Sequence, residues 1–339
     1  MLAYMEFTLK DMKLRNRLVM PPMCMYSSDS TGQVMDFHRA HYSARSLGGV
    51  GLIILEATSV EPVGRITDQD LGIWDDSQTA GLAEVVRLIH SGGATAGIQL
   101  AHAGRKSKSA AGESVGPSAL FFNSDYRIPH QLTVDEITQT VKLFQAAASR
   151  ALQAGFDTIE LHGAHGYLIH EFLSPLANQR TDEYGGPLEN RVRFLQEILS
   201  AIKAVWPENK PVLLRLSASD YLPGGLDLEE TVRIVNLVKD DVDLFHISSG
   251  GIMGSPVPTF PGYQLRFSEA VKSLCQVPTI AVGLITELSQ VEEILGNQRA
   301  DLVALGRELL RNPFWPIRQS LVNKNADCPV PIQYRRAWL

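Results

Sequence analysis

The sequence contains little cysteine and no paired cysteine motif. Its 339 residues include three cysteines, Cys24, Cys275 and Cys328, and no two of them form a C-x-x-C pair. An odd number without that spacing argues against a disulfide framework, an iron–sulfur cluster and a zinc ribbon. We therefore expect reduced thiols.

Long apolar runs are also missing. No stretch is apolar enough for long enough to cross a bilayer, and the first residues, MLAYMEFTLKDMKLRNR, contain no sustained apolar segment of the kind that a signal peptide needs. The sequence therefore predicts a protein without a membrane span that remains in the cytoplasm.

Two further motif classes are absent. The chain has 31 basic and 37 acidic residues, a formal charge of −6, and no block of lysine and arginine, which argues against nucleic-acid partners. The segment GGVGLI at 48–53 does not match G-x-G-x-x-G, and no Walker phosphate loop is present. A dinucleotide bound on a Rossmann unit is therefore unsupported.

Short β-rich apolar runs alternate with longer amphipathic segments along the whole chain, a pattern typical of repeated βα units. The predicted strands are 17–22, 51–56, 95–100, 157–162, 211–216, 242–247, 278–282 and 301–305. The predicted helices are about 37–48, 78–91, 134–154, 189–206, 228–240, 265–275, 286–296 and 307–322. Thr133 and Glu136 form a capping-box pattern at the third helix. Because no linker divides the eight units, residues 1–339 are predicted to form one α/β domain, a (β/α)8 TIM barrel, with a doubly wound sheet as the alternative.

Candidate site residues lie at or just after the predicted strands, where a barrel carries its active site. They are Met23, Cys24, Ala57, Gln99, His102, His162, His165, Arg215, Ser248 to Gly251, Gly283, Gly306 and Arg307. Two connections, about 101–132 and 163–188, are unusually long, which is more typical of functional loops than of simple connections.

The last two strands suggest a phosphate site. AVGLIT and ALGREL each place a glycine, Gly283 or Gly306, directly after a strand, and Arg307 follows Gly306. Glycines alone are more often explained by tight turns, but a guanidinium can hold phosphate through two hydrogen bonds. Arg215, near the end of a buried strand, is expected to face an anionic or carbonyl-rich ligand, because an unpaired buried charge is costly.

The segment LHGAHGYLIHEF at 161–172 contains three histidines and a tyrosine. His162 and His165 have the spacing of a zinc-site fragment, but no convincing third ligand lies nearby. The residues alone leave metal ligands, core side chains and hydrogen-bond donors as alternatives, and for His170 we expect a structural role.

Several ordered motifs together resemble the Old Yellow Enzyme family of flavin-dependent oxidoreductases. They are PMCMYS (22–27), EATSV followed by GRITDQDLGIW (56–74), QLAHAGRK (99–106), HGAHGYLIHEFLSP (162–175) and NQRTDEYGGPLENRVRF (178–194). The early Cys24 and the terminal QYRRAW are most similar to the thermophilic-like (YqjM-type) subclass of NADPH dehydrogenases and ene-reductases.

The resemblance implies non-covalent FMN reduced by NADPH. Pro21, Pro22, Met23, Cys24 and Ala57 would line the flavin, while Gly283, Gly306 and Arg307 would hold its phosphate. Gln99 would bond the pyrimidine edge, and Arg215 would stabilise the negative charge that reduction places near N1 and C2. Pro21 departs from the serine or alanine that relatives often have there, which puts a side-chain contact at that position in doubt.

The resemblance also implies a substrate site. His162 and His165 would donate hydrogen bonds to the carbonyl oxygen of an α,β-unsaturated compound, and Tyr167 would supply a proton to its α-carbon. Gly163 replaces the alanine frequent in the motif, a change expected to leave both imidazoles in place. Tyr26 and Lys106 are further candidate substrate contacts, with solvent-exposed packing as an even alternative. The expected reaction is a ping-pong reduction of an activated C=C bond, with quinones or nitro compounds as other acceptors.

Cys24 and the C-terminal tail carry two further hypotheses. Cys24 is expected to tune the flavin rather than to act as a nucleophile, with simple buried packing as the alternative. The tail, residues 323–339, concentrates Tyr334, Arg335, Arg336 and Trp338, residue types enriched in interfaces. By resemblance, Arg336 would reach the substrate pocket of a neighbouring subunit in a homodimer or homotetramer, although composition alone would favour a frayed tail.

Other functions remain as alternatives. A dienoyl-CoA reductase would carry a C-terminal extension and cluster cysteines, which this chain lacks, and a dihydrouridine synthase would need a surface for RNA. A metal-dependent barrel hydrolase could use the histidines on zinc, and a flavin-storage protein could hold FMN without turnover. The sequence alone does not decide the natural substrate.

Overall fold

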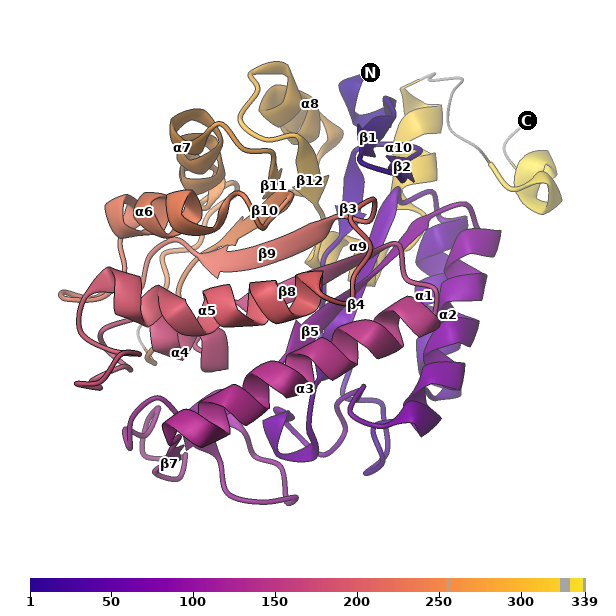
Figure 1. Ribbon diagram of the computed structural model, residues 1–339. Coiled ribbons are helices and arrows are strands. Elements are labelled where there is room, and N and C mark those ends of the chain that lie inside the picture. The colour runs from indigo at the N-terminus through magenta and orange to yellow at the C-terminus, as the bar shows by residue number, and fades with distance from the viewer. Residues whose placement is uncertain (255, 324–329, 338–339) are drawn as a thin grey trace.

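The computed structural model of the chain describes residues 1–254, 256–323 and 330–337. Eight parallel strands close a barrel in the order β10-β11-β12-β3-β4-β5-β8-β9 (Figure 1). Their bounds are β3 Leu18–Met20, β4 Leu52–Ser59, β5 Thr95–Ala101, β8 Thr158–Gly163, β9 Val212–Ser217, β10 Leu244–Ser248, β11 Thr279–Ala281 and β12 Leu302–Ala304. Each lies at a predicted strand, so the (β/α)8 barrel is confirmed and the doubly wound sheet is wrong.

Helices surround the barrel, so strands such as β4, β8 and β9 are buried along their whole length (Figure 1). The helices that follow the strands are α1 Asp36–Leu47, α2 Thr79–Ser91, α3 Val134–Gln153, α5 Leu188–Lys203, α6 Leu228–Val238, α7 Leu265–Cys275, α8 Leu288–Gly296, α9 Arg307–Arg311 and α10 Trp315–Val322. The predicted capping box is present at α3, where the side chain of Thr133 accepts from the N–H of Glu136. No helix of the described residues is long and apolar enough to cross a membrane.

Three features differ from the predicted elements. The helix expected over 307–322 is two helices, because Pro313 lies between α9 and α10 and a proline cannot donate the bond that a continuous helix needs. A short helix, α4 Leu168–Leu173, lies within the long connection at 163–188. In the connection at 101–132, two short strands, β6 Val115–Gly116 and β7 His130–Gln131, pair with each other.

An N-terminal hairpin, also absent from the predicted elements, packs into the barrel interior. Strands β1 Phe7–Leu9 and β2 Met12–Leu14 pair antiparallel. Met12 and Leu14 are buried in one apolar cluster with barrel residues that include Leu52, Leu213 and Leu302. Because Asp11 N–H donates to the carbonyl of Asn209, just before β9, the hairpin covers the amino-terminal end of the barrel. The active site is therefore expected at the opposite end of the barrel, where the strands have their carboxyl ends.

Candidate active site

The carboxyl ends of the strands hold most of the predicted site residues. A cavity of about 240 Å³ lies there. Its lining includes His165, Arg215, Ser248, Gly283, Gly306 and Arg307. These residues come from five different βα units, so barrel closure, not sequence proximity, brings them together.

His162 and His165 form a directed pair of neutral imidazoles. Nδ1 of His162 accepts from Ala164 N–H at 3.3 Å, so its proton is on Nε2, which lies 3.4 Å from Nδ1 of His165. Nε2 of His165 lies 2.7 Å from the hydroxyl of Ser248. Burial, and then the charge of Arg215, hold the pKa of both imidazoles well below the ordinary value. Each neutral imidazole therefore keeps one ring N–H, which in this structure points from His162 to His165 and from His165 to Ser248.

The backbone at His165 is held in the left-handed region, with φ of +59°. Its N–H donates to Ser217 Oγ at 3.0 Å, and its carbonyl accepts from Lys106 Nζ at 2.9 Å. His170 lies in the core, where Nδ1 accepts from Gly166 N–H at 2.8 Å and Nε2 faces Asp220 at 3.0 Å. The structural role expected for His170 is confirmed, and it supports the turn that carries the site histidines.

Tyr167 lies beside this pair. Its ring meets that of His162 edge to face at 4.9 Å between centroids, and Lys106 Nζ lies 4.8 Å from the Tyr167 centroid. Burial raises the pKa of Tyr167 well above the ordinary value, so the phenol keeps its proton at neutral pH. Burial lowers the pKa of Lys106 to about 8. Lys106 is therefore packed within the site region rather than extended into solvent.

The barrel interior beneath the histidines contains a second polar group. Gln99 Nε2 donates to Glu160 Oε1 at 2.7 Å, and His246 Nδ1 lies 2.8 Å from Glu160 Oε2. Arg215 is placed in register with both His162 and His246, and its buried Nε has no hydrogen-bond partner within the described residues. The sequence reasoning missed Glu160 and His246, although a charged residue inside the apolar run DTIELH was a usable signal.

The same end of the barrel fits a phosphorylated, anionic cofactor. Arg215, Arg307 and Arg311 line the cavity, and Gly283, with φ of +140°, and Gly306 add backbone without side chains. The unpartnered Nε of Arg215 is a donor of the kind that an anionic or carbonyl-rich ring edge would satisfy. Arg311 was not predicted, because it lies a full helical turn beyond Arg307.

The segment 21–26 forms another side of this region. Pro21 and Pro22 are buried, Met23 and Cys24 are half-buried, and Tyr26 is exposed. Burial, followed by the charges of Asp70 and Glu56, raises the pKa of Cys24, so its thiol stays protonated. Such a thiol is a poor nucleophile.

Ala57 and Tyr167 line one small cavity together with Asp70. Ala57 comes from β4, and Tyr167 precedes α4. The predicted flavin contact and the predicted proton donor are therefore neighbours in space.

Arg336 is not brought to the cavity by its own chain. It lies in the exposed turn η5 Ile332–Ala337, which stands away from the barrel (Figure 1). The turn contacts the body through the rings of Tyr334 and Phe314, at 5.8 Å between centroids. Trp338 lies outside the described residues.

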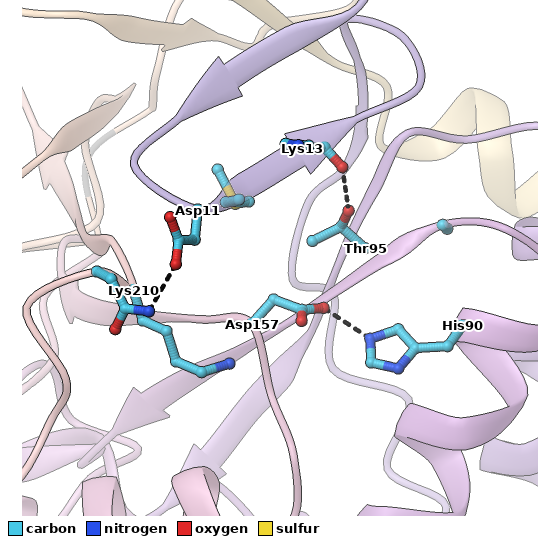
Figure 2. Close-up of a pocket in the computed structure, with 9 residues that line it drawn as sticks. Asp11, Lys13, His90, Thr95, Asp157 and Lys210 are labelled. Atoms are coloured by element: carbon cyan, nitrogen blue, oxygen red, sulfur yellow. Dashed lines mark hydrogen bonds and ion pairs between the residues drawn. The ribbon is translucent and has the colours of Figure 1, made fainter.

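A larger cavity, of about 410 Å³, lies at the amino-terminal end of the barrel (Figure 2). Polar groups that line this cavity are paired with each other. His90 Nε2 lies 2.7 Å from Asp157 Oδ2, and Thr95 Oγ1 donates to the carbonyl of Lys13 at 3.0 Å. None of the predicted site residues lines it. The contacts dock the N-terminal hairpin onto the strands.

A search for metal-ligand clusters covered residues 1–254, 256–323 and 330–337. Within those ranges, no three His, Cys, Asp or Glu side chains are grouped so that they could hold a metal ion. The ring nitrogens of His162 and His165 instead face each other, a backbone N–H and a serine hydroxyl.

Comparison with known proteins decides the family. The model of the NADH:flavin oxidoreductase / NADH oxidase family matches residues 4–324. The chain belongs to this family. It is 54% identical over 340 residues to an NADPH dehydrogenase of Clostridium acetobutylicum, covering all of both chains. It is 49% identical to an NADPH dehydrogenase of Bacillus subtilis, covering 99% of this chain and 98% of the relative.

A solved structure of morphinone reductase shares the fold, with a TM-score of 0.82, 29% identity, and coverage of 94% of this chain and 89% of that one. The resemblance to the Old Yellow Enzyme family is thereby confirmed, and the chain is an oxidoreductase of a flavin-using family.

Proposed function

We propose that this protein is an FMN-dependent NADPH dehydrogenase that reduces the activated C=C bond of α,β-unsaturated carbonyl compounds by a ping-pong reaction. The observation that carries the proposal is the neutral pair His162 and His165, with Tyr167 beside it, at the edge of an arginine-lined cavity. The relatives from Clostridium acetobutylicum and Bacillus subtilis, which are 54% and 49% identical to this chain, are both named NADPH dehydrogenase. Their names support NADPH as the reductant.

The cofactor would be held by residues from both ends of the chain. Arg307, with Gly283 and Gly306, would bind the phosphate, and Arg215 would bond the pyrimidine edge together with Gln99 of β5. Pro21, Pro22, Met23, Cys24 and Ala57 would line the ring. When bound, FMN would supply the hydride chemistry that no side chain can supply.

The substrate would be oriented by the histidine pair. Its carbonyl oxygen gains negative charge as hydride reaches the β-carbon, and fixed N–H donors stabilise that charge better than water does. Burial keeps both imidazoles neutral, so each would donate its one ring N–H to the substrate oxygen in place of its present partner, His165 or Ser248. Tyr167, whose phenol stays protonated, would give its proton to the α-carbon. Tyr26 and Lys106 would contact the rest of the substrate.

The site would be completed by a second copy of the chain. Arg336 is exposed and does not line the cavity of its own chain, as expected of a residue that a homodimer or homotetramer would donate to a neighbour. In such an assembly every protomer both donates and receives a tail.

One anaerobic spectroscopic experiment tests the function. The purified protein should show flavin absorption that bleaches when NADPH is added and returns when 2-cyclohexen-1-one follows. Released cofactor should be identified as FMN by mass spectrometry. A colourless protein, or a reduced flavin that the enone leaves bleached, contradicts the proposal.

A further inference from the structure

Glu56 is a buried carboxylate at an irregular point of β4, next to the predicted site. Its exposed fraction is 1%. Leu55 pairs with Ile98 and Ala57 pairs with Gln99, so Glu56 is an extra residue that has no partner in the ladder. Such a bulge turns a side chain away from the direction that strict alternation would give it.

The carboxylate joins α1 to the segment 21–26. Oε1 accepts from the hydroxyl of Tyr42 at 3.0 Å, and the Tyr42 oxygen accepts from Glu56 N–H at 3.0 Å. Oε2 accepts from Met25 N–H at 2.8 Å. His38 Nδ1 accepts from Met35 N–H, so Nε2 carries the proton and faces Oε1 at 3.5 Å. Oε1 is therefore held by Tyr42 of α1, and Oε2 holds the backbone of the segment 21–26.

The segment needs such an acceptor. Pro21 and Pro22 have no N–H, and residues 21–26 belong to no helix or strand. Tyr26 has φ of +50°, a conformation that non-glycine residues rarely adopt without support from their surroundings. Glu56 receives the Met25 N–H one residue before this strained position.

Simple packing does not account for a carboxylate here. Burial raises the pKa of Glu56 to about 7, against the hydrogen bonds from Met25 and Tyr42. The groups that face it are His38 and Tyr42 from α1, Cys24 and Tyr26 from the segment, and Asp70 from the connection after β4. An apolar residue would avoid the cost of burying the charge but could not hold Met25.

We infer that Glu56 is a positioning residue that, through the backbone N–H of Met25, holds Cys24 and Tyr26 against the bound cofactor and substrate. That the segment 21–26 contacts cofactor and substrate rests on the proposed function, whereas the hydrogen bond from Met25 N–H to Glu56 does not. Tyr42 anchors the carboxylate from α1, and neither Glu56 nor Tyr42 lines the cavity of the site.

Amide hydrogen exchange tests the contact in the complete protein. Glu56→Ala should speed exchange of the Met25 amide by about tenfold, because the hydrogen bond from this N–H to the buried carboxyl oxygen is lost. Tyr42→Phe is the matched control: it disturbs the same buried network but leaves the Met25 acceptor, so it should lower the melting temperature while changing Met25 exchange by less than about twofold. Glu56→Leu keeps most of the side-chain volume but has no acceptor for the Met25 N–H, and it replaces the alanine variant should that one fail to fold. Unchanged Met25 exchange in a folded Glu56 variant overturns the inference.

A double-mutant cycle tests the consequence for the site. The FMN midpoint potential and the enone KM are measured in wild type, Cys24→Ala, Glu56→Leu and the double variant. Glu56→Leu removes the acceptor of Met25, so it should change both quantities, and its effect on the potential should be much smaller when Cys24 is already alanine. Purely additive effects mean that Glu56 does not act through the segment. If the wild type contains no flavin, the proposed function fails, while the exchange result still decides the contact.

Discussion

At the scale of single residues, burial sets the protonation state of the site. Desolvation by burial is the largest cause of the pKa shifts of His162, His165 and Tyr167. Neutral imidazoles and a neutral phenol suit a site that stabilises a developing oxyanion and then delivers one proton.

Replacement of both histidines should separate cofactor binding from substrate binding. The double variant His162→Ala, His165→Ala should keep FMN, because Arg307, Gly283 and Gly306 are unchanged, and should lose about 10²- to 10³-fold or more in enone kcat/KM. Stopped-flow measurement of each half-reaction checks this, with reduction by NADPH as the internal control. Loss of FMN together with activity would contradict the assignment.

Cys24→Ala should change the flavin without removing activity. The thiol is protonated and half-buried, so we expect it to tune the FMN midpoint potential and to alter both half-reactions moderately. Spectroelectrochemical titration measures the potential. An unchanged potential with full activity would leave Cys24 with a packing role alone.

Glu171 predicts a pH dependence of stability. Burial raises the pKa of this α4 side chain from 4.5 to about 8, and Oε1 accepts from Arg105 N–H at 3.0 Å. A folded-state pKa above the unfolded value means that its contribution is fully present below about pH 4.5 and is lost as pH rises through about 8. The free energy of unfolding of the wild type, relative to Glu171→Gln, should therefore fall across that interval in urea titrations. A constant difference between the two proteins would refute the shift.

At the scale of elements, local sequence signals mark where helices begin and break. The start of α3 is set by Thr133 and Glu136, and the break between α9 and α10 by Pro313. Pro313 is visible in the sequence and indicates a break there. The prediction nevertheless gave one helix over 307–322, because the apolar pattern continues on both sides of the proline.

Removal of the α3 cap should destabilise the fold modestly. Thr133→Ala should lower the free energy of unfolding by about 1 kcal/mol, because the Glu136 N–H loses its side-chain acceptor. Thr138→Ala is the control: this exposed threonine lies inside the same helix and donates to the carbonyl of Val134, so its loss should change stability by less than about 0.5 kcal/mol. Equal effects of the two substitutions in denaturant titrations would contradict a capping role.

At the scale of the whole molecule, the C-terminal tail is the part of the chain whose proposed role needs a second copy of the protein. The exposed turn at Ile332–Ala337 contacts its own chain at Phe314, between α9 and α10, and Arg336 does not line the cavity. The role proposed for Arg336 therefore requires a neighbouring subunit.

Arg336→Ala should raise the enone KM by about tenfold, as for loss of an interface hot spot, with FMN occupancy intact. Mixed assembly with the variant His162→Ala, His165→Ala should restore some native-like sites, because each defective protomer supplies what the other lacks. Arg335→Ala offers a matched control in the same turn. A monomeric mass in solution, or full activity after removal of residues 332–339, would contradict the shared site.

The sequence by itself determined the barrel fold and which residues follow each of its strands. Apolar runs and amphipathic segments are local patterns, and a barrel gathers strand ends at one face, so residues such as His162, Arg215 and Gly306 could be assigned to one site before any contact was known. What remained depends on contacts between distant residues. The bulge that aims Glu56 at Met25, the pairing of Glu160 with His246, and the hairpin that covers the barrel end are products of register and closure. They join residues that are 31, 86 and about 200 positions apart, and no local pattern carries that information, because only the closed barrel sets which side chains meet.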